Sequence, residues 1–254
     1  MRRLEGKAAV VTGAGSGIGE AIARRFAAEG AWVAIGDIDA RNGERVAASL
    51  GEMATAIATD VADRASVEHL AAAAAERWGR LDVWVNNAGV AVFGDPLAIS
   101  DADWRRCMSV DLEGAWNGCR AALPRLIAQG GGAIVNIVSN HSFQVMRDTF
   151  PYPVAKHGLL GLTRALALQY ADRGIAVNAI SPGWIETPQT LSQFAATPDP
   201  ARTRAEVEAK QPVKRLGRPD EIAAIVALLA SDEARFIIGA NIIADGGVGI
   251  RMYE

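Results

Sequence analysis

Residues 8–19 read Ala-Ala-Val-Val-Thr-Gly-Ala-Gly-Ser-Gly-Ile-Gly, and this stretch decides the fold. Its first five residues are apolar up to the final threonine, which is typical of a strand buried on both faces. Gly13, Gly17 and Gly19 form a G-x-x-x-G-x-G turn, and a helical pattern follows as far as Gly30. Such glycines let backbone N–H groups approach a pyrophosphate at the positively polarised N-terminus of a helix. The turn therefore indicates phosphate binding, although a tight strand-to-helix turn without a ligand also uses glycines.

The same alternation of short apolar runs and longer helical patterns continues along the chain. Uniformly apolar strands separated by helices predict an α/β fold, in which a parallel sheet is covered on both faces. We expect strands at Ala8–Thr12, Trp32–Asp37, Ala54–Thr59, Val83–Val85, Ala133–Val138, Ile175–Ile180 and Asn241–Ala244. We expect helices at Gly17–Gly30, Ala40–Leu50, Ala65–Trp78, Asp101–Gln129, Tyr152–Arg173 and Pro219–Ala230. Residues 188–212 fit neither pattern and predict a lid, with a short helix around Arg202–Lys210.

The composition narrows the class of protein. A chain of 254 residues, 50% hydrophobic and 22% charged, suits one large α/β domain with a substantial core. Its net charge of -3 lacks the basic signature of a nucleic-acid or anionic-lipid partner. The longest apolar runs, such as Ala223–Ala230, are too short to span a bilayer. We therefore expect no nucleic-acid partner and no membrane segment.

The N-terminus and the cysteines favour a cytoplasmic protein. Arg2-Arg3 is similar to the start of an export signal, but the polar stretch Leu4–Lys7 follows in place of an apolar core. Cys107 and Cys119 are expected on one helix, where their spacing separates the Cα atoms by about 18 Å. A disulfide needs Cα atoms within about 7 Å, so we expect two packing thiols.

Asp37 ends the second predicted strand, about 20 residues after the glycine turn. An acid at this position accepts hydrogen bonds from both ribose hydroxyls of an adenosine and repels a 2′-phosphate. Ile38 and Asp39 follow it, so no arginine stands beside it to bind such a phosphate. These residues predict NAD rather than NADP. The alternative is that Asp37 caps the next helix, a role that Asp39 could also take.

Tyr152 and Lys156 are four residues apart, which places them one turn apart on the same face of a helix. An ammonium near a phenol stabilises the phenolate and lowers the phenol's pKa from about 10 towards neutrality. A phenol tuned in this way can exchange a proton with an alcohol near neutral pH. Ser139 follows an apolar run and could hydrogen-bond the same substrate oxygen. Because such a Tyr–Lys pair also arises by chance in long helices, its meaning depends on the nucleotide-binding turn.

Taken together, these residues resemble the short-chain dehydrogenase/reductase family from Gly6 to Gly247. The resemblance implies a single Rossmann-like domain over residues 1–254, with a doubly wound parallel sheet of about seven strands. It also implies hydride transfer between a nicotinamide and a carbonyl or alcohol. The matching motifs, in the family's order, are Thr12-Gly13, Gly17-Ile18-Gly19, Asp60-Val61, Asn86-Asn87-Ala88-Gly89, Ser139, Tyr152 with Lys156, Asn178, Pro182-Gly183 and Asp245-Gly246-Gly247.

The resemblance assigns cofactor roles to several segments. Asp60 and Val61 would contact the adenine, Thr187 would bind the nicotinamide carboxamide, and Lys156 would bind the nicotinamide ribose. No metal is expected. The full set of cofactor residues is Gly13, Ser16, Gly17, Ile18, Gly19, Asp37, Asp60, Val61, Asn87, Ala88, Gly89, Tyr152, Lys156, Pro182, Gly183, Ile185 and Thr187.

The same resemblance makes Ser139, Tyr152 and Lys156 catalytic, with Asp111 as a fourth member. The family usually has Asn in an Asn-Leu-x-Gly motif, whereas this chain reads Asp111-Leu112-Glu113-Gly114. The family's Asn is thought to hold a water that links the lysine to solvent. A carboxylate could hold a water too, but its charge favours the ammonium form of Lys156. The alternative is that Asp111 only stabilises an irregularity in its helix.

The residues expected near the reacting carbon are mostly polar. They are Ser139, Asn140, His141, Gln144, Arg147, Tyr152 and Trp184, with Asp148 and Glu186 close by. Such a set suits a polyhydroxylated molecule, and the segments around Ser139 and Tyr152 resemble bacterial sugar 1-dehydrogenases of the L-rhamnose and L-fucose type. Those oxidise an aldose to its lactone. The alternative is that these side chains line a wet loop or a subunit contact.

Two other functions remain open within the same fold. A ketone or 3-oxoacyl reductase would usually favour NADPH and a basic residue near position 38, which is Ile38 in this chain. A non-catalytic NAD-binding regulator would be expected to lack the tyrosine or the lysine. The family usually forms tetramers through two long helices and C-terminal contacts, so we expect a homotetramer with a small-molecule substrate.

Overall fold

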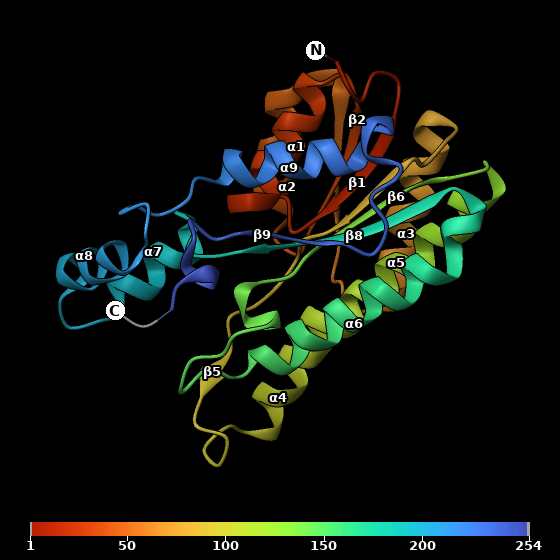
Figure 1. Ribbon diagram of the computed structural model, residues 1–254. Coiled ribbons are helices and arrows are strands. Elements are labelled where there is room, and N and C mark those ends of the chain that lie inside the picture. Colours follow the sequence, from red (N-terminus) through yellow and green to blue (C-terminus); the bar gives the residue numbers. More distant parts are fainter. Residues whose placement is uncertain (1, 253–254) are drawn as a thin grey trace.

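Seven parallel strands run in the order β3-β2-β1-β4-β6-β8-β9 in the computed structural model, which describes residues 2–252 (Figure 1). The predicted α/β class and the count of seven strands are confirmed. The strands are β1 (Ala8–Thr12), β2 (Trp32–Asp37), β3 (Ala54–Ala58), β4 (Val83–Asn86), β6 (Gly132–Ile137), β8 (Ile175–Pro182) and β9 (Asn241–Ala244).

The strand order reverses between β1 and β4. The chain adds β2 and β3 on one side of β1, and then crosses the sheet to continue through β4, β6, β8 and β9. The first and central strands are buried along their whole length, which explains why β1, β4, β6 and β8 carry apolar residues on both faces. In sheets of this kind ligands bind at the carboxyl edge where the order reverses.

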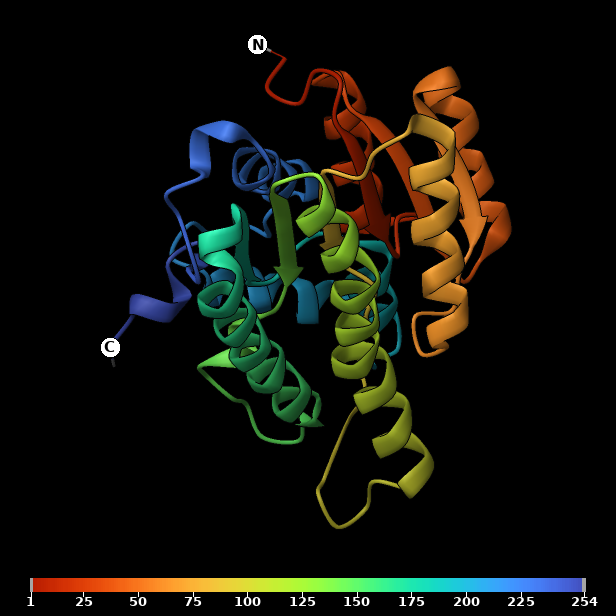
Figure 2. The same cartoon turned by 90° about the vertical axis from the view of Figure 1, so that its right-hand side faces the viewer.

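Helices cover both faces of the sheet (Figure 2). One face packs against α1 (Gly17–Ala28), α2 (Ala40–Leu50) and α9 (Pro219–Ala230), and the other against α3 (Arg64–Trp78), α5 (Gly114–Ala128) and α6 (Tyr152–Tyr170). Short 3₁₀ helices occur at Gly51–Met53, Asn140–Ser142, Ala171–Arg173, Asp232–Ala234 and Val248–Ile250.

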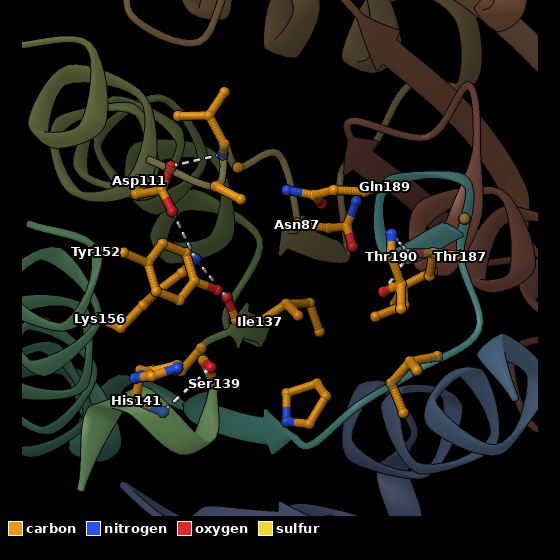
Figure 3. Close-up of a pocket in the computed structure, with 18 of the residues that line it drawn as sticks. Asn87, Asp111, Ile137, Ser139, His141, Tyr152, Lys156, Thr187, Gln189 and Thr190 are labelled. Atoms are coloured by element: carbon orange, nitrogen blue, oxygen red, sulfur yellow. Dashed lines mark hydrogen bonds and ion pairs between the residues drawn. The ribbon is translucent and has the colours of Figure 1, made fainter. Parts of the chain in front are cut away.

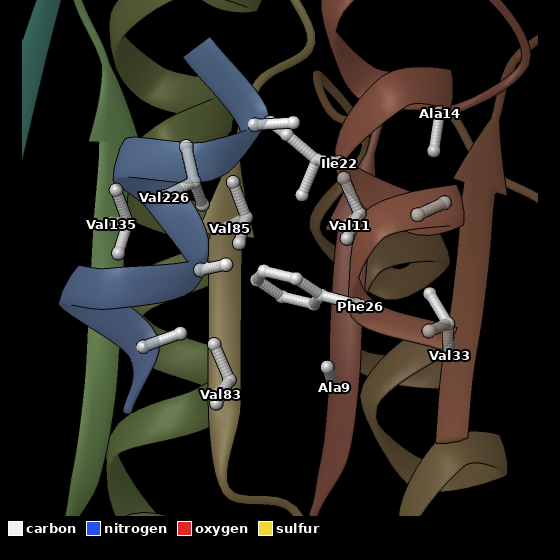
Figure 4. Packing of buried hydrophobic residues seen from close by; sticks show 14 of the residues in the cluster. Ala9, Val11, Ala14, Ile22, Phe26, Val33, Val83, Val85, Val135 and Val226 are labelled. Carbon is white, nitrogen blue, oxygen red and sulfur yellow. The ribbon is translucent and has the colours of Figure 1, made fainter. Parts of the chain in front are cut away.

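The core beneath α1 and α9 is built around one aromatic side chain. Phe26 is fully buried and packs in one cluster with Val11, Ile22, Val85 and Val226 (Figure 4). This cluster fixes α1 against the sheet, and α1 begins at the glycine turn. The position of the turn therefore depends on apolar packing two helical turns away.

A chain of buried hydrogen bonds links β4 to α6 through β6. The Trp84 indole donates to Asn86 Oδ1 (2.7 Å), and Asn86 Nδ2 donates to Asn136 Oδ1 (2.8 Å). Asn136 Nδ2 in turn donates to Thr163 Oγ1 (2.9 Å), and Thr163 donates to the Leu159 carbonyl. Because each buried polar group has a partner, the network sets how α6 lies against the sheet.

The helix predicted over Asp101–Gln129 is interrupted. The chain forms α4 (Asp101–Met108), a π-helical turn (Ser109–Glu113) and α5. Gly114 follows the turn and packs so closely on Val61 that an added Cβ would lie 2.8 Å from its side chain. The π-helical turn therefore leads into a start of α5 that packs on Val61, in the loop after β3. The Asp111 side chain lies buried in the protein interior.

Two short strands and one helix lie outside the sequence predictions. Two short strands, β5 (Phe93–Gly94) and β7 (Phe150–Pro151), pair in antiparallel fashion next to the N-terminus of α6. The segment 188–212 holds two helices, α7 (Pro188–Ala195) and α8 (Pro200–Lys210), where only the second was expected. Both lie beyond the carboxyl edge of the sheet (Figure 1). Between residues 2 and 252, no helix is both long and apolar enough to cross a membrane.

Replacing Phe26 with Ala should lower the free energy of unfolding by about 3–5 kcal/mol, because it opens a cavity in the α1–α9 core. Urea unfolding followed by circular dichroism measures the change. Leu97→Ala is the matched control, since Leu97 is 99% exposed and its loss should change stability by less than about 0.5 kcal/mol. Equal effects of the two variants would contradict this account of the core.

Candidate active site

A cavity of about 930 Å³ opens at the carboxyl edge of the sheet and extends from Asp37 to Tyr152. It brings together nearly all of the residues predicted to bind a cofactor. Those that line it are Gly13, Ser16, Gly17, Ile18, Asp37, Asp60, Val61, Asn87, Ala88, Gly89, Tyr152, Lys156, Pro182, Gly183, Ile185 and Thr187.

Gly19 is the exception, because it is buried behind the turn and does not line the cavity. A Cβ on Gly19 would collide with the carbonyl oxygen of Gly13 and the side-chain amide of Asn87. Gly19 thus packs α1 closely on the turn, and its predicted place at the cofactor stays a prediction. Gly13 and Gly17 do line the cavity, and both have positive φ (63° and 56°), which suits glycine.

The ends of β1 and β4 are tied together at the turn. Asn87 Nδ2 donates to the carbonyl oxygens of Thr12 (2.9 Å) and Gly13 (3.0 Å). Thr12 Oγ1 accepts the backbone N–H groups of Asn87 (3.0 Å) and Ala88 (3.2 Å). These bonds hold the two strand ends at the point where the strand order reverses.

The N-terminus of α1 points its unpaired N–H groups at the cavity. Glu20 N–H donates to Ser16 O as the first helical bond, so the N–H groups of the preceding residues have no partner within the helix. Ser16 occupies the cap position but makes no capping bond with its side chain. This end of the helix therefore has the donors and the partial positive charge that a pyrophosphate requires.

Asp37 stands at the opposite end of the cavity from Tyr152. Its Oδ2 accepts the Gly15 N–H (2.7 Å) and its Oδ1 accepts the Asp39 N–H (2.9 Å). Asp39, not Asp37, caps α2, since its side chain accepts N–H bonds from the first turn. The predicted alternative, that Asp37 is the helix cap, is therefore wrong.

Ser139, Tyr152 and Lys156 lie together at the other end of the cavity, around the end of β6 and the start of α6 (Figure 3). The Lys156 Nζ lies 5.4 Å from the centre of the Tyr152 ring. Ser139 caps a 3₁₀ turn, and its Oγ accepts the His141 N–H (3.1 Å). The His141 ring packs edge-on against Tyr152, with ring centres 5.6 Å apart.

Lys156 is held by a buried ion pair. Its Nζ lies 3.2 Å from Asp111 Oδ2, and the two side chains are 4% and 0% exposed. Nζ also donates to the Ile137 carbonyl (3.3 Å), while Asp111 Oδ1 accepts the Val90 N–H (2.8 Å). Asp111 lies within the π-helical turn and its side chain faces Lys156, and its predicted catalytic role stays a prediction.

Burial raises the pKa of Tyr152, and Lys156 acts against this rise without overcoming it. The sequence predicted a lowered pKa, and the correction has a physical reason. Asp111 compensates the lysine charge and itself acts to raise the phenol's pKa, while Ser139 acts to lower it. Burial also raises the pKa of Asp111. Burial lowers the pKa of Lys156, but the Asp111 carboxylate and Tyr152 outweigh it and the net direction is upward.

The predicted substrate residues separate into two groups. Asn140, His141, Gln144 and Trp184 line the cavity, whereas Arg147 does not. Arg147 lies in an exposed loop beside Asp148, whose backbone is left-handed (φ 58°), and both residues are outside the cavity wall. Glu186 also lies outside it, paired with Arg204 at 2.8 Å.

Several lining residues were not predicted. Phe93 packs edge-on to Tyr152 with ring centres 5.3 Å apart, and it belongs to the short strand β5 that no pattern indicated. Gln189 and Gln193 are four residues apart on α7, a spacing that could have shown them to share a face. The unpredicted lining residues also include Val90, Ala91, Val145, Met146, Val207, Lys210, Gln211 and Val248.

Comparison with known proteins gives this geometry a family. The family model adh_short_C2, described as enoyl-(acyl carrier protein) reductase, matches residues 13–249. The chain belongs to the short-chain dehydrogenase/reductase family. Short-chain dehydrogenase/reductase enzymes act on the CH–OH group of an alcohol, or on the matching ketone, with a nicotinamide cofactor.

Three similar proteins show the range of the family. Cis-4-hydroxycyclohexanecarboxylate dehydrogenase of Sinomonas cyclohexanicum is 44% identical over 95% of this chain and 96% of its own length. D-threitol dehydrogenase of Mycolicibacterium smegmatis is 40% identical over 98% of this chain and 95% of its own. The crystal structure of 3-ketoacyl-(acyl-carrier-protein) reductase from Brucella melitensis, complexed with NADH, is 32% identical and superposes with a TM-score of 0.90 over 97% of this chain and 99% of that one.

Gly19→Ala should weaken the binding of NADH by about tenfold or more, equivalent to about 1.4 kcal/mol, because the new methyl group pushes the Gly13 carbonyl and the Asn87 amide apart. Titration of NADH followed by its fluorescence measures the dissociation constant. Gly43→Ala is the control, since Gly43 stands behind Asp37 with room for a methyl group. Unchanged binding by the Gly19 variant would show that the turn tolerates the shift.

Proposed function

We propose that this enzyme is an NAD-dependent dehydrogenase that oxidises a secondary alcohol of a sugar or another polyhydroxylated small molecule. The observation that carries the proposal is one continuous cavity. It runs from the Asp37 carboxylate, past the N-terminus of α1, to the group of Ser139, Tyr152 and Lys156. A dinucleotide and a small substrate would share this cavity, with the reacting carbon at Tyr152.

The preference for NAD is supported at the Asp37 end. The Asp37 carboxylate lines the cavity, where it would accept hydrogen bonds from the adenosine ribose and would repel a 2′-phosphate. Arg45, the cation bonded to this turn, is occupied by Glu20 Oε2 and Gly15 O (2.7 and 2.8 Å). A related reductase also holds NADH in its crystal structure.

The cavity residues fit a dinucleotide. The α1 N-terminus would hold the pyrophosphate, Asp60 and Val61 the adenine, and Thr187 and Ile185 the nicotinamide carboxamide. A bound oxidised nicotinamide would supply the hydride acceptor and a positive charge.

Three side chains would handle the substrate alcohol. Tyr152 takes the hydroxyl proton as general base, and Ser139 hydrogen-bonds the same oxygen as charge develops on it. Lys156 stabilises the phenolate from one turn below. Asp111 reaches the reaction only through Lys156, so we place it among the positioning residues rather than the catalytic ones.

The proposed substrate follows from the wall beyond Tyr152. Asn140, Gln144, Gln189 and Gln193 offer amide donors and acceptors to hydroxyl groups, and Trp184 offers a flat apolar face. Relatives named for a tetritol and for a hydroxylated cyclohexane ring agree with a polyol or a ring alcohol. An aldose, oxidised to its lactone, is the substrate class we favour.

A ketone reductase is the second candidate. Phe93, Val145 and Met146 give the cavity an apolar side that hydroxyl recognition does not explain. This side suits an aliphatic or alicyclic ketone, and the matching family model and one similar structure carry reductase names.

We also propose a lid over the cavity and an oligomeric state for this enzyme. Residues 188–212, as α7 and α8, would act as a lid because they supply Gln189, Gln193, Val207 and Lys210 to the cavity. The proposed oligomeric state is a homotetramer, which exposed apolar side chains on the long helices and near the C-terminus support, at Trp116, Leu168 and Phe236. A cytoplasmic location is part of the same proposal.

NADH formation across aldoses, acyclic polyols, cyclic alcohols and long-chain secondary alcohols, with NAD and NADP in parallel, tests the proposed reaction. We expect an aldose or polyol to give the highest kcat/KM, and NAD to be preferred by at least about tenfold. Activity confined to the reduction of ketones with NADPH would establish the second candidate instead.

Tyr152→Phe should lower kcat by about 10²–10⁴-fold, because the variant keeps the ring and loses the proton acceptor. NADH binding, measured by fluorescence, should stay close to that of the parent enzyme. Tyr170→Phe is the matched control, since Tyr170 is the last residue of α6 and lies outside the cavity wall, and this variant should keep the turnover of the parent enzyme. Full activity of the Tyr152 variant would refute the assignment.

A further inference from the structure

The ion pair between Asp111 and Lys156 is buried in the wall of the cavity. Asp111 Oδ2 lies 3.2 Å from Lys156 Nζ, with side chains 0% and 4% exposed, so water and salt screen these charges much less than they would at the surface. Asp111 cannot turn away, since its Oδ1 accepts the Val90 N–H at 2.8 Å. A buried ion pair of this kind is costly to form and strongly destabilising to break from one side.

We propose that Asp111 is a positioning residue that sets the charge of the Asp111–Lys156–Tyr152 cluster and so sets the pH above which Tyr152 can act as a base. The proposal rests on the proposed function, in which Tyr152 accepts the alcohol proton. It goes beyond that function because it makes the working pH range a property of a residue that does not touch the substrate.

The net charge of the buried Asp111–Lys156–Tyr152 cluster depends on residue 111. With the phenol protonated, Asp111 and Lys156 cancel, and the cluster is neutral. Loss of the phenol proton then creates a net negative charge without solvent to stabilise it, which is unfavourable. With a neutral amide at position 111, the cluster begins at one positive charge and becomes neutral when it loses a proton. The first deprotonation therefore moves to lower pH in the amide variant.

Other charges near the cluster are the same in the parent enzyme and in the amide variant, so they leave the difference between the two unchanged. They are the positive nicotinamide of the proposed cofactor and Arg106, which lies exposed on α4 and acts against the rise that burial causes in the pKa of Asp111. Burial raises the pKa of Cys107, on α4, to about 12, so its thiol stays neutral at working pH. Burial lowers the pKa of His141, on the 3₁₀ turn after β6, which keeps that ring neutral as well. His157 on α6 bonds the Pro153 carbonyl (2.8 Å).

Asp111→Asn is the direct test, because it removes one charge and keeps the size and shape of the side chain. The chain has three tyrosines, so the phenolate absorbance of Tyr152 can be isolated by subtracting the same titration of a Tyr152→Phe background. We expect the apparent pKa of the Tyr152 phenol to fall by about one pH unit or more in the Asn variant. The acid limb of kcat against pH for alcohol oxidation should move in the same direction by a similar amount.

Asp82→Asn is the matched control. Asp82 is also a buried carboxylate that accepts a backbone N–H, from Ala8 at 2.8 Å, and pairs with a cation, Arg80 at 2.7 Å, but at the opposite end of β4. It should leave the phenol titration and the pH profile where they are. Asp111→Ser, a smaller neutral variant, should shift both in the same way as Asp111→Asn.

The possible outcomes distinguish a failure of the proposed function from a failure of the proposed role of Asp111. An inactive Tyr152→Phe with a shifted Asp111→Asn profile supports both the function and the role of Asp111. An inactive Tyr152→Phe with folded Asp111→Asn and Asp111→Ser variants that titrate like the parent enzyme would overturn the role of Asp111 alone. An active Tyr152→Phe would overturn the proposed function, while the phenol titration would still report on the charge cluster. Thermal unfolding of every variant shows that the proteins compared are folded.

Discussion

The site depends on one set of hydrogen bonds, in which Asn87 and Thr12 join the end of β4 to the end of β1. Where the order of a parallel sheet reverses, the connections that follow the two neighbouring strands run to opposite faces of the sheet, and a crevice opens between them. The Asn87 amide holds the carbonyl oxygens of Thr12 and Gly13. This arrangement aims the glycine turn, and with it the positive end of α1, at the crevice. Apolar packing around Phe26 then fixes the helix behind the turn.

The second half of the site is placed from inside the core. The hydrogen bonds from Trp84 through Asn86 and Asn136 to Thr163 cross from β4 to α6. They set the position of the helix whose first turns carry Tyr152 and Lys156. The two ends of the cavity are thus held by different polar contacts, and both sets of contacts include β4. The sheet therefore fixes the distance between the Asp37 end and the Tyr152 end of the cavity.

The fold could be predicted from patterns that are local in the chain, whereas most of the predicted cavity residues came from the family resemblance. The bounds of β1, β2, α2 and α9 agree with the apolar runs and helix starts that predicted them. A helix irregularity at Asp111 was one of the two predicted readings, but its π-helical form and the buried contact of Asp111 with Lys156 depend on tertiary packing that the sequence does not show. The raised pKa of Tyr152 needed knowledge of burial and of Asp111 beside Lys156. Arg147 lies outside the cavity wall, although it was predicted near the reacting carbon. The polar residues of this exposed loop do not reveal from sequence alone which of them face the cavity.

Asp37 has a consequence for any attempt to change the nucleotide that the protein accepts. The carboxylate that is proposed to face the ribose also supports the glycine turn, because its Oδ2 accepts the Gly15 N–H and its Oδ1 accepts the Asp39 N–H. A substitution by a side chain without acceptor oxygens removes both of these bonds together with the charge. Redesign for a phosphorylated nucleotide therefore has to restore the internal support of the turn as well as its electrostatics. In the proposed function, nucleotide selectivity and local folding are coupled through this one side chain.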